Sequence, residues 1–346
     1  MNIKKEWLNN PVFKKLCDAV AENNLVCLTG AGISKGLVLK NGERAPDWQE
    51  LLENIKSAVG NDFSDTEKDD LNIILSNNPS GENLIEASSI LCSKNRKVFL
   101  KALSDAVDLK EGQTSLTHKR LLDLLPKGIL TYNYDNAHET AIKKAKANNK
   151  WKIILPSDEH SIVEELKSNL NKPFLFKMHG SIKSKRTMVL TRESYRDLFI
   201  KYPFYKAFIQ QIFTNYQLLI IGFGLSDPDF EMLLQNTFST FGSPIQDHIV
   251  IKHIKDKSSE DVIYKRRYGL NFLYIEDFSH IPEILKDCLF TPGSIVNEII
   301  DNCINSCLSV RRKSHSDVRA LSDIGKKCLA NILEKKIRLN IKKNHP

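Results

Sequence analysis

Four short segments, far apart in the chain, carry the residue types from which a chemical site could be built: TGAGIS (29–34), TYNYD (131–135), KMHGS (177–181) and IGFGLSDPDF (221–230). Glycines let backbone N–H groups approach an anion closely, so the turn at Gly30 and Gly32 is typical of a phosphate-binding loop. Histidine is the side chain that most often acts as a general base near neutral pH, which makes His179 a candidate base. The first question is which phosphate-bearing ligand such a turn would bind.

The glycine turn fits neither of the two most familiar phosphate-binding patterns. A nucleotide triphosphate loop needs G-x-x-x-x-G-K-[ST], and neither Gly30 nor Gly32 has a glycine-lysine pair at that offset. The dehydrogenase fingerprint G-x-G-x-x-G has its last glycine at the sixth position, where this chain has Lys35, with Gly36 one place late. The identity of the ligand must therefore be inferred from the rest of the chain.

Each segment alone also has a structural interpretation. A single histidine after a strand is most often a residue with satisfied hydrogen bonds. Asp135 or Asn136 would be a plausible helix cap. Gly222 and Gly224 would serve to end a strand, and Asp227-Pro228-Asp229 is a good helix start with proline in the first turn. Only the combination of the four segments favours a functional site.

The pattern of apolar residues predicts strands that alternate with helices. Strands are expected at Leu25–Thr29, Gly128–Tyr132, Lys152–Leu155, Phe174–Met178, Met188–Thr191, Gln217–Ile221, His248–His253 and Asn271–Ile275. Helices are expected between several of them, notably over Ser194–Asn215, Asp229–Phe238 and Asp261–Tyr268. This alternation predicts an α/β fold, Rossmann-like, with a mainly parallel sheet covered on both faces. Ligands of such sheets bind at the carboxyl ends of the strands, where Gly30, Asn133, His179 and Gly222 are expected.

Two regions depart from this alternation. Residues 64–107 are predicted to be wholly helical, and we interpret about 60–110 as a helical module inserted into the core. From Pro292 onward the pattern is again purely helical. The expected organisation is a nucleotide-binding domain over 1–292 and a basic helical extension over 293–346 that could serve oligomerisation or partner contact.

Composition excludes several classes of protein. The 41% hydrophobic and 27% charged residues are those of a globular protein, with no run of the roughly 18 apolar residues that a membrane helix needs. The N-terminus lacks the apolar core of a secretory signal, so a cytoplasmic location is expected. The seven scattered cysteines form no C-x-x-C pair, which argues against a disulfide framework and against a structural zinc site.

The net charge of +8 is concentrated near the C-terminus. Residues 295–346 hold eleven lysines and arginines against five acidic residues, a net +6. A basic helical segment of this kind is most often a solvated or partner-binding face, so contact with nucleic acid is expected to be at most non-specific.

In order and context, the four segments resemble the sirtuin family. The family's G-A-G-I-S loop is matched letter for letter at 30–34, and its proline-aspartate-aromatic element resembles Pro46-Asp47-Trp48. Its T-Q-N-I-D motif resembles residues 131–135, and its histidine-glycine pair is matched at 179–180. Its late G-T-S-L strand end resembles residues 222–225. The resemblance covers roughly residues 12 to 290, and His118 within it is taken as structural.

The resemblance implies that the glycine turn cradles the diphosphate of NAD and that NAD is a substrate. Asn133 would then orient the ribose hydroxyls and an attacking water, and His179 would be the general base. Asp135 would bind ribose or nicotinamide, or would fix its loop. The NAD-binding residues implied by the matched motifs are Gly30, Ala31, Gly32, Ser34, Trp48, Thr131, Asp135, Gly222, Phe223 and Gly224.

The chain also departs from the deacetylase pattern of the family. Deacetylating sirtuins carry two C-x-x-C pairs after the histidine, whereas no cysteine lies between Cys92 and Cys288 here, so no metal is expected. The inserted helices and the G-x-G-L-S-D-P-D strand end resemble instead the zinc-less bacterial antiphage-defence branch, whose members hydrolyse NAD and deplete the cell. We therefore expect an NAD glycohydrolase that releases nicotinamide and ADP-ribose. The alternatives are an NAD-dependent protein deacylase and a catalytically silent module that senses NAD or ADP-ribose.

Partners are inferred from the same branch. A hydrolase that depletes NAD must stay inactive until it is triggered, and control through a homo-oligomer is a simple way to arrange this. The stretch after Pro292 is too short for a typical large sensor domain, so a separate activating protein is expected, such as a HerA-type ATPase or a nucleotide-processing enzyme. An apolar stripe at helical spacing that begins at Ile295 and Val296 is the candidate assembly contact.

Overall fold

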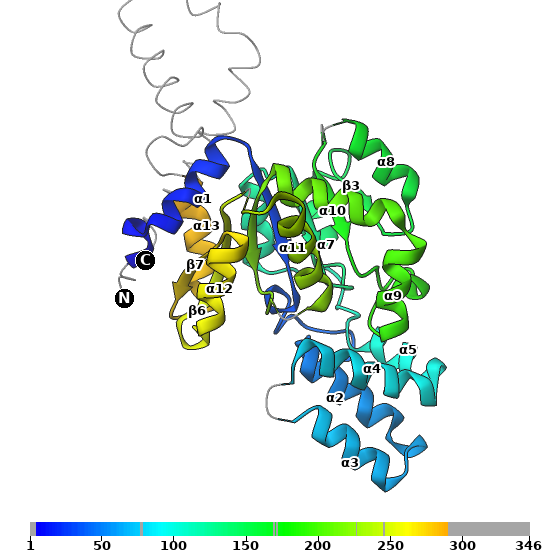
Figure 1. Ribbon diagram of the computed structural model, residues 1–346. Helices are drawn as coiled ribbons and strands as arrows, with labels where there is room; N and C mark the ends of the chain where they lie inside the picture. The colour runs from blue at the N-terminus through cyan, green and yellow to red at the C-terminus, as the bar shows by residue number, and fades with distance from the viewer. Residues whose placement is uncertain are drawn as a thin grey trace, which may run out of the picture.

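The computed structural model describes residues 5–289 apart from 77, 78, 169, 171, 226 and 245. The expected helical extension over 293–346 lies outside the described residues. The fold can therefore be followed from the first helix of the core to the last, and these two helices contact each other near one edge of the sheet (Figure 1).

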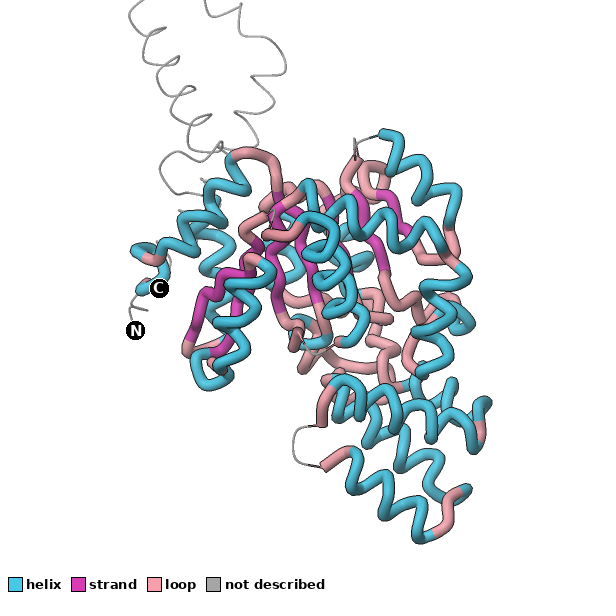
Figure 2. The backbone as a smooth tube through the Cα atoms, in the orientation of Figure 1, coloured by secondary structure: helices cyan, strands magenta, loops and turns pink. Residues whose placement is uncertain are grey.

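A seven-stranded sheet forms the centre of the described chain (magenta in Figure 2). Every neighbouring pair of its strands is parallel. Its spatial order is β3-β4-β2-β1-β5-β6-β7. The strands are β1 (Leu25–Thr29), β2 (Gly128–Thr131), β3 (Lys152–Ile154), β4 (Phe174–Lys177), β5 (Gln217–Ile221), β6 (His248–His253) and β7 (Leu270–Ile275). The predicted α/β class with a parallel sheet is confirmed.

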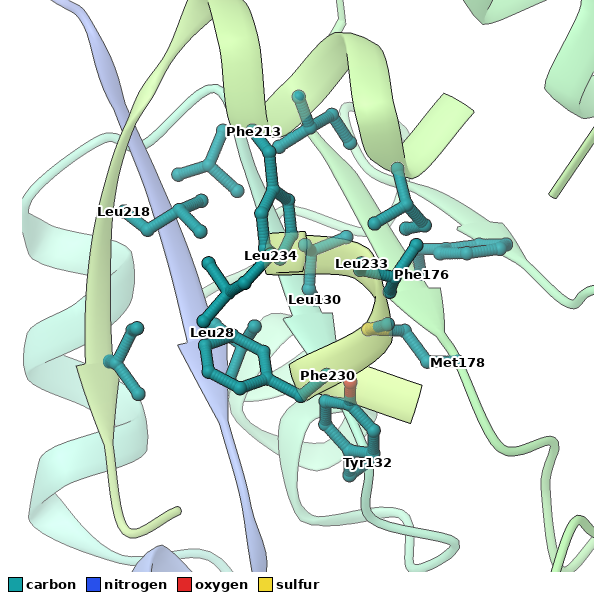
Figure 3. Packing of buried hydrophobic residues seen from close by; sticks show 14 of the residues in the cluster. Leu28, Leu130, Tyr132, Phe176, Met178, Phe213, Leu218, Phe230, Leu233 and Leu234 are labelled. Carbon is teal, nitrogen blue, oxygen red and sulfur yellow. The ribbon is translucent and has the colours of Figure 1, made fainter. Parts of the chain in front are cut away.

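Helices cover both faces of the sheet because its central strands are apolar on both sides. Every residue of β1 and β5 is buried. Val26 and Leu28 pack on the face covered by α8 (Glu159–Ser168), α9 (Arg192–Lys201), α10 (Pro203–Asn215), α11 (Pro228–Phe241) and α12 (Ser259–Tyr268). Figure 3 shows part of this cluster, where Phe213 and Phe230 meet Leu28 of the sheet. Leu25 and Cys27 point the other way, toward α1 (Pro11–Ala21), α6 (Leu116–Asp123), α7 (Ala137–Lys144) and α13 (Ile281–Leu289).

The direction in which successive strands are added reverses at β1. The chain builds β2, β3 and β4 on one side of β1 and then places β5, β6 and β7 on its other side. A crevice opens at such a reversal, outside the carboxyl ends of the central strands, and it is the usual ligand site of an open parallel sheet. Here those ends are the residues that follow β1, β2, β4 and β5.

A separate helical layer lies beyond one end of the sheet (Figure 1). It consists of α2 (Trp48–Val59), α3 (Asp65–Ile74), α4 (Gly81–Lys94) and α5 (Arg96–Asp105), which share one apolar cluster. Capping boxes at Asp47/Glu50 and Ser64/Glu67 satisfy the first backbone N–H groups of α2 and α3. Because α2 packs with the other three helices, the helical layer begins at Trp48 rather than near residue 60.

Some local expectations were wrong. Met188–Thr191 is not a strand, since its backbone N–H groups are bound elsewhere: that of Val189 donates to His179 O at 2.9 Å and that of Leu190 to Ser194 Oγ at 2.9 Å. The expected helix over Ser194–Asn215 is two helices, α9 and α10, with Pro203 at the first position of the second. The sequence reasoning also missed α8.

Candidate functional site

A cavity of about 650 Å³ occupies the crevice at the carboxyl ends of β1, β2, β4 and β5. Its floor is formed by the residues that follow these strands, among them Gly30, Asn133, His179 and Gly222. Its opposite wall comes from the helical layer, through residues such as Trp48 and Leu84. Both its size and its position are those of a small-molecule site in an α/β protein.

Two glycine turns meet at the base of this cavity. The N–H of Gly32 donates to Gly222 O at 2.9 Å, and that of Gly30 donates to Ile221 O at 3.2 Å. A Cβ on Gly30 would lie 2.6 Å from Gly222 O, and one on Gly32 would lie 2.8 Å from Gly222 Cα. Gly222 itself has a φ of +64°, a left-handed conformation that favours glycine. The glycines are therefore needed for the close approach of the two turns, whatever ligand the cavity binds.

Asn133 lies at the start of the loop that follows β2 and is tied to the glycine turn. Its Nδ2 donates to Gly30 O at 3.1 Å and to Ser34 Oγ at 3.2 Å. Its backbone N–H donates to Thr131 Oγ1 at 3.1 Å. The side chain is buried and held by two hydrogen bonds to the glycine turn, which fixes it in the floor of the cavity.

The Lys177 side chain anchors the loop that carries Asn133. This side chain is fully buried, and its Nζ donates to Tyr134 O at 3.1 Å, to Asp135 O, and to Glu139 Oε1 at 2.9 Å. The lysine thus links the end of β4, which His179 follows, to the loop that carries Asn133. A charged residue at the end of the apolar strand FLFK is the sequence signal that would have revealed this link.

Aromatic side chains enclose His179. The Tyr132 ring packs against the imidazole at 4.5 Å between ring centroids, and the Tyr195 ring at 5.0 Å, both edge to face. The Nε2 atom of His179 lies 3.6 Å from Asp229 Oδ2 and has no hydrogen-bond partner among the residues described. The imidazole is therefore held by packing and faces a carboxylate.

The DPD segment (residues 227–229) supplies two buried carboxylates beside this histidine. Asp227 caps α11, where its Oδ1 accepts from Asp229 N at 2.9 Å, and its Oδ2 accepts from the Tyr195 hydroxyl at 2.8 Å. Asp229 Oδ2 accepts from the Tyr205 hydroxyl at 2.7 Å. The pKa of Asp227 is raised to about 6, chiefly by burial; the neighbouring His179 acts to lower this pKa, and the Asp229 carboxylate acts to raise it.

These three side chains are also the group within the described chain that could hold a metal ion. Donor atoms of His179, Asp227 and Asp229 all lie within 4.8 Å of one another, and all three residues are buried. A tetrahedral ion with bonds of about 2.1 Å would need donors roughly 3.4 Å apart, so the group would have to contract to bind one. The expectation that the protein needs no metal stays a prediction.

The helical layer contributes an apolar wall with a charged rim. Leu51, Leu84 and Val107 line the cavity beside Trp48. At the rim, Lys35 Nζ lies 2.7 Å from Asp47 Oδ2, and this hydrogen bond is the main cause that raises the pKa of Lys35. The pairing joins the loop after the glycine turn to the start of α2.

The structure brings nearly all the predicted site residues to this one cavity. Those that line it are Gly30, Ala31, Gly32, Ser34, Trp48, Asn133, Asp135, His179, Gly222, Phe223 and Gly224. Thr131 is buried beneath it and binds the backbone N–H of Asn133 instead. Asp135 Oδ1 accepts from Ala137 N at 2.8 Å, so its side chain also fixes the start of α7.

Other lining residues were not identified from the sequence. Asp227 was interpreted as part of a helix start and Tyr132 lay within the TYNYD segment, but neither was assigned to the site, and Tyr195 belonged to no motif. Asp256 and Phe278 follow β6 and β7 and extend the cavity toward that edge of the sheet. Only the strand order brings these residues to the same crevice.

The motifs and the fold agree with comparison to known proteins. A family model described as "SIR2-like domain" matches residues 127–273. The match covers less than half of this chain. The seven-stranded parallel sheet is consistent with the Rossmann-like fold of sirtuins.

Its relatives among curated proteins are distant. The "NAD(+) hydrolase ThsA" of Enterococcus faecium is 24% identical over 319 residues, which cover 83% of this chain and 61% of the relative. The protein of the same name from Bacillus cereus (strain MSX-D12) is 24% identical over 313 residues, covering 86% of this chain and 58% of the relative. "Defense-associated sirtuin 2" of Bacillus subtilis is 23% identical over 232 residues, covering 65% of this chain and 20% of the relative. The chain thus spans about three fifths of the two hydrolases it matches.

Among solved structures, one titled "Structural Basis for the Mechanism and Regulation of Sir2 Enzymes" aligns with 80% of this chain and 97% of its own. The TM-score is 0.39 and the sequence identity 14%. Within the described residues, no helix is long and apolar enough to span a bilayer.

Proposed function

We propose that this chain binds NAD in the cavity and hydrolyses the bond between nicotinamide and ribose. The observation that carries the proposal is that Asn133 and His179, from different strands, meet the glycine turn in one cavity. The relatives named as NAD(+) hydrolases support this reaction over others that a nucleotide site could perform.

The reaction needs no general acid, but it needs the substrate to be positioned accurately. Nicotinamide in NAD is a cationic pyridinium, so it leaves with the bonding electron pair without needing a proton. Positive charge then develops at the anomeric carbon, and the site must stabilise it and deliver a nucleophile. Asn133 would orient the ribose hydroxyls and a water, and His179 would accept the proton that this water loses as its oxygen bonds to the carbon.

The two ends of NAD would contact different parts of the cavity. The diphosphate would lie against the turn at Gly30–Ser34 and the end of β5. The nicotinamide end would lie near Asn133 and His179, where Tyr132 and Phe223 stack at 4.5 Å between ring centroids and present an apolar surface. The apolar residues of the helical layer would exclude bulk water from the reacting carbon.

We further propose that the reaction serves antiphage defence by depleting NAD, under the control of a homo-oligomer and a separate activating protein. The relative named "Defense-associated sirtuin 2" supports a role in defence. No bound metal is required in the proposed reaction, because neither the leaving group nor the nucleophile needs a Lewis acid.

The test is chromatographic analysis of purified protein incubated with NAD, alone and with its activating partner. Nicotinamide should appear without any acylated peptide. Asn133→Ala and His179→Ala should each reduce release by at least about 10²-fold, the scale of losing a positioned base. His160→Ala is the matched control, since the His160 side chain is 86% exposed, and it should leave the rate unchanged.

Two outcomes would redirect the proposal. Nicotinamide release that requires an acetyl-lysine peptide would make the protein a deacylase. Binding of NAD or ADP-ribose without any turnover, in the presence of the partner, would make it a sensing module.

A further inference from the structure

The segment after β5 places two aspartates beside His179 that differ in their bonding. Asp227 is committed to the fold, because its two oxygens accept from backbone N–H groups of α11 and from the Tyr195 hydroxyl. Asp229 does not cap the helix. Its side chain is 0% exposed, its Oδ2 binds the Tyr205 hydroxyl, and its Oδ1 has no hydrogen-bond partner among the residues described.

A buried carboxylate oxygen without a partner is costly unless another group compensates it. The other oxygen of this carboxylate, Oδ2, lies 3.6 Å from Nε2 of the His179 imidazole, and that nitrogen is likewise buried without a hydrogen-bond partner among the residues described. This separation is somewhat longer than a hydrogen bond. Hydrogen bonds of catalytic groups are often long in a site without substrate and shorten when it binds.

We propose that Asp229 is the positioning residue of His179, forming a histidine–aspartate pair that the DPD segment builds into the cavity. The carboxylate keeps the proton of the imidazole on the ring nitrogen that faces it. The other ring nitrogen then stays basic. The inference rests on the proposed function, in which that basic nitrogen takes a proton from water.

The reaction balances with this pair. The water proton moves to the basic nitrogen, the water oxygen bonds to the anomeric carbon, and the carbon–nitrogen bond breaks with its electron pair going to nicotinamide. The imidazole then carries a second proton and a positive charge, which the Asp229 carboxylate stabilises until the proton is lost to solvent. Tyr205 holds the carboxylate in place, and the rings of Tyr132 and Tyr195 hold the imidazole.

The decisive variant is Asp229→Asn, because an amide has nearly the same shape but offers an N–H donor to the histidine and loses the charge. We expect kcat to fall by about 10²-fold or more, with the affinity for NAD changed less than about threefold. We also expect the acid limb of kcat/KM against pH to move, since the titratable groups against the imidazole are Asp229, Asp227, Tyr132 and Tyr195 and the variant removes one charge.

Tyr205→Phe provides a milder second variant that keeps the carboxylate and removes only its anchoring hydroxyl. A drop in kcat of several-fold, with unchanged affinity for NAD, is expected. Should Asp229→Asn fail to fold, this variant still decides the matter: a rate equal to that of the wild type would overturn the pairing.

A readout that needs no turnover separates this inference from the proposed function. Nitrogen NMR of the full chain with labelled histidine reports which ring nitrogen of His179 carries the proton. The tautomer should change between wild type and Asp229→Asn. If it does so in a protein that never hydrolyses NAD, the pairing stands and the proposed function fails. If NAD is hydrolysed and Asp229→Asn keeps the rate and the tautomer of the wild type, the pairing is wrong. Loss of wild-type activity on chelation, restored by one divalent ion per chain, would also overturn it, because the three side chains would then be metal ligands.

Discussion

Replacing Lys177 with methionine should destabilise the protein far more than replacing a surface lysine. The Lys177 side chain is 1% exposed and that of its partner Glu139 is 11% exposed, so methionine would leave a carboxylate buried without a counter-charge. The carbonyl oxygens of Tyr134 and Asp135 would lose a charged donor in the same change. Breaking a buried ion pair by removing one partner costs about 3–5 kcal/mol of unfolding free energy.

The assay is urea unfolding followed by circular dichroism. With an m-value of about 3 kcal/mol/M, the midpoint should fall by roughly 1–1.7 M. Lys201→Met is the matched control: its Nζ lies 2.6 Å from Asp197 Oδ2, closer than in the buried pair, but the Lys201 side chain is 60% exposed. An exposed pair of this kind contributes about 0.3–0.5 kcal/mol, so the control midpoint should move by less than about 0.2 M.

A double variant separates the orphaned charge from the lost packing. Lys177→Met combined with Glu139→Gln removes both charges and should be more stable than Lys177→Met alone. Equal stability of the single and double variants would show that the charge is not the cause. A shift for Lys177→Met no larger than that of Lys201→Met would refute the reasoning altogether.

Three further predictions concern other parts of the chain. Gly180→Ala should cost about 2 kcal/mol or more in thermal unfolding, because φ is +86° and the new Cβ would lie 2.1 Å from Thr187 O; Gly36→Ala, with φ of +84° and nothing within 4 Å, should cost only the backbone strain of about 1 kcal/mol. Burial raises the pKa of Asp227 to about 6, so the folded state binds this proton more tightly than the unfolded state, and the contribution of this group to stability falls as pH rises from about 4 to 6. The stability of Asp227→Asn relative to wild type should therefore increase over that pH range in urea unfolding. Parallel curves of stability against pH for the two proteins would contradict the raised pKa. Deletion of 293–346 should change the number of subunits per particle, measured by light scattering, if that segment forms the proposed assembly contact. An unchanged number of subunits would remove that hypothesis.

The motifs were sufficient to predict the strand ends that meet at the site. Four-residue apolar runs (LVCL and LLII) bounded by polar residues or glycine identify β1 and β5, because the middle of a strand buried on both faces is apolar. The rule that ligands bind at the carboxyl ends of parallel strands then brings Gly30, Asn133 and His179 together before any coordinates are known. Periodicity did less well where the backbone follows no repeat: Met188–Thr191 has the composition of a strand but is held by loop contacts to His179 and Ser194.

The sequence by itself determined the fold class and the candidate site residues, because both depend on local signals: alternation of strands and helices, glycine at tight turns, and a histidine or asparagine shortly after a strand. Only the tertiary structure decided what surrounds them. The approach of Gly32 to Gly222, the bond from Lys177 to the Asn133 loop and the carboxylate of Asp229 beside His179 all join segments separated by more than forty residues. The order of strands in the sheet creates these contacts, and no local pattern specifies that order.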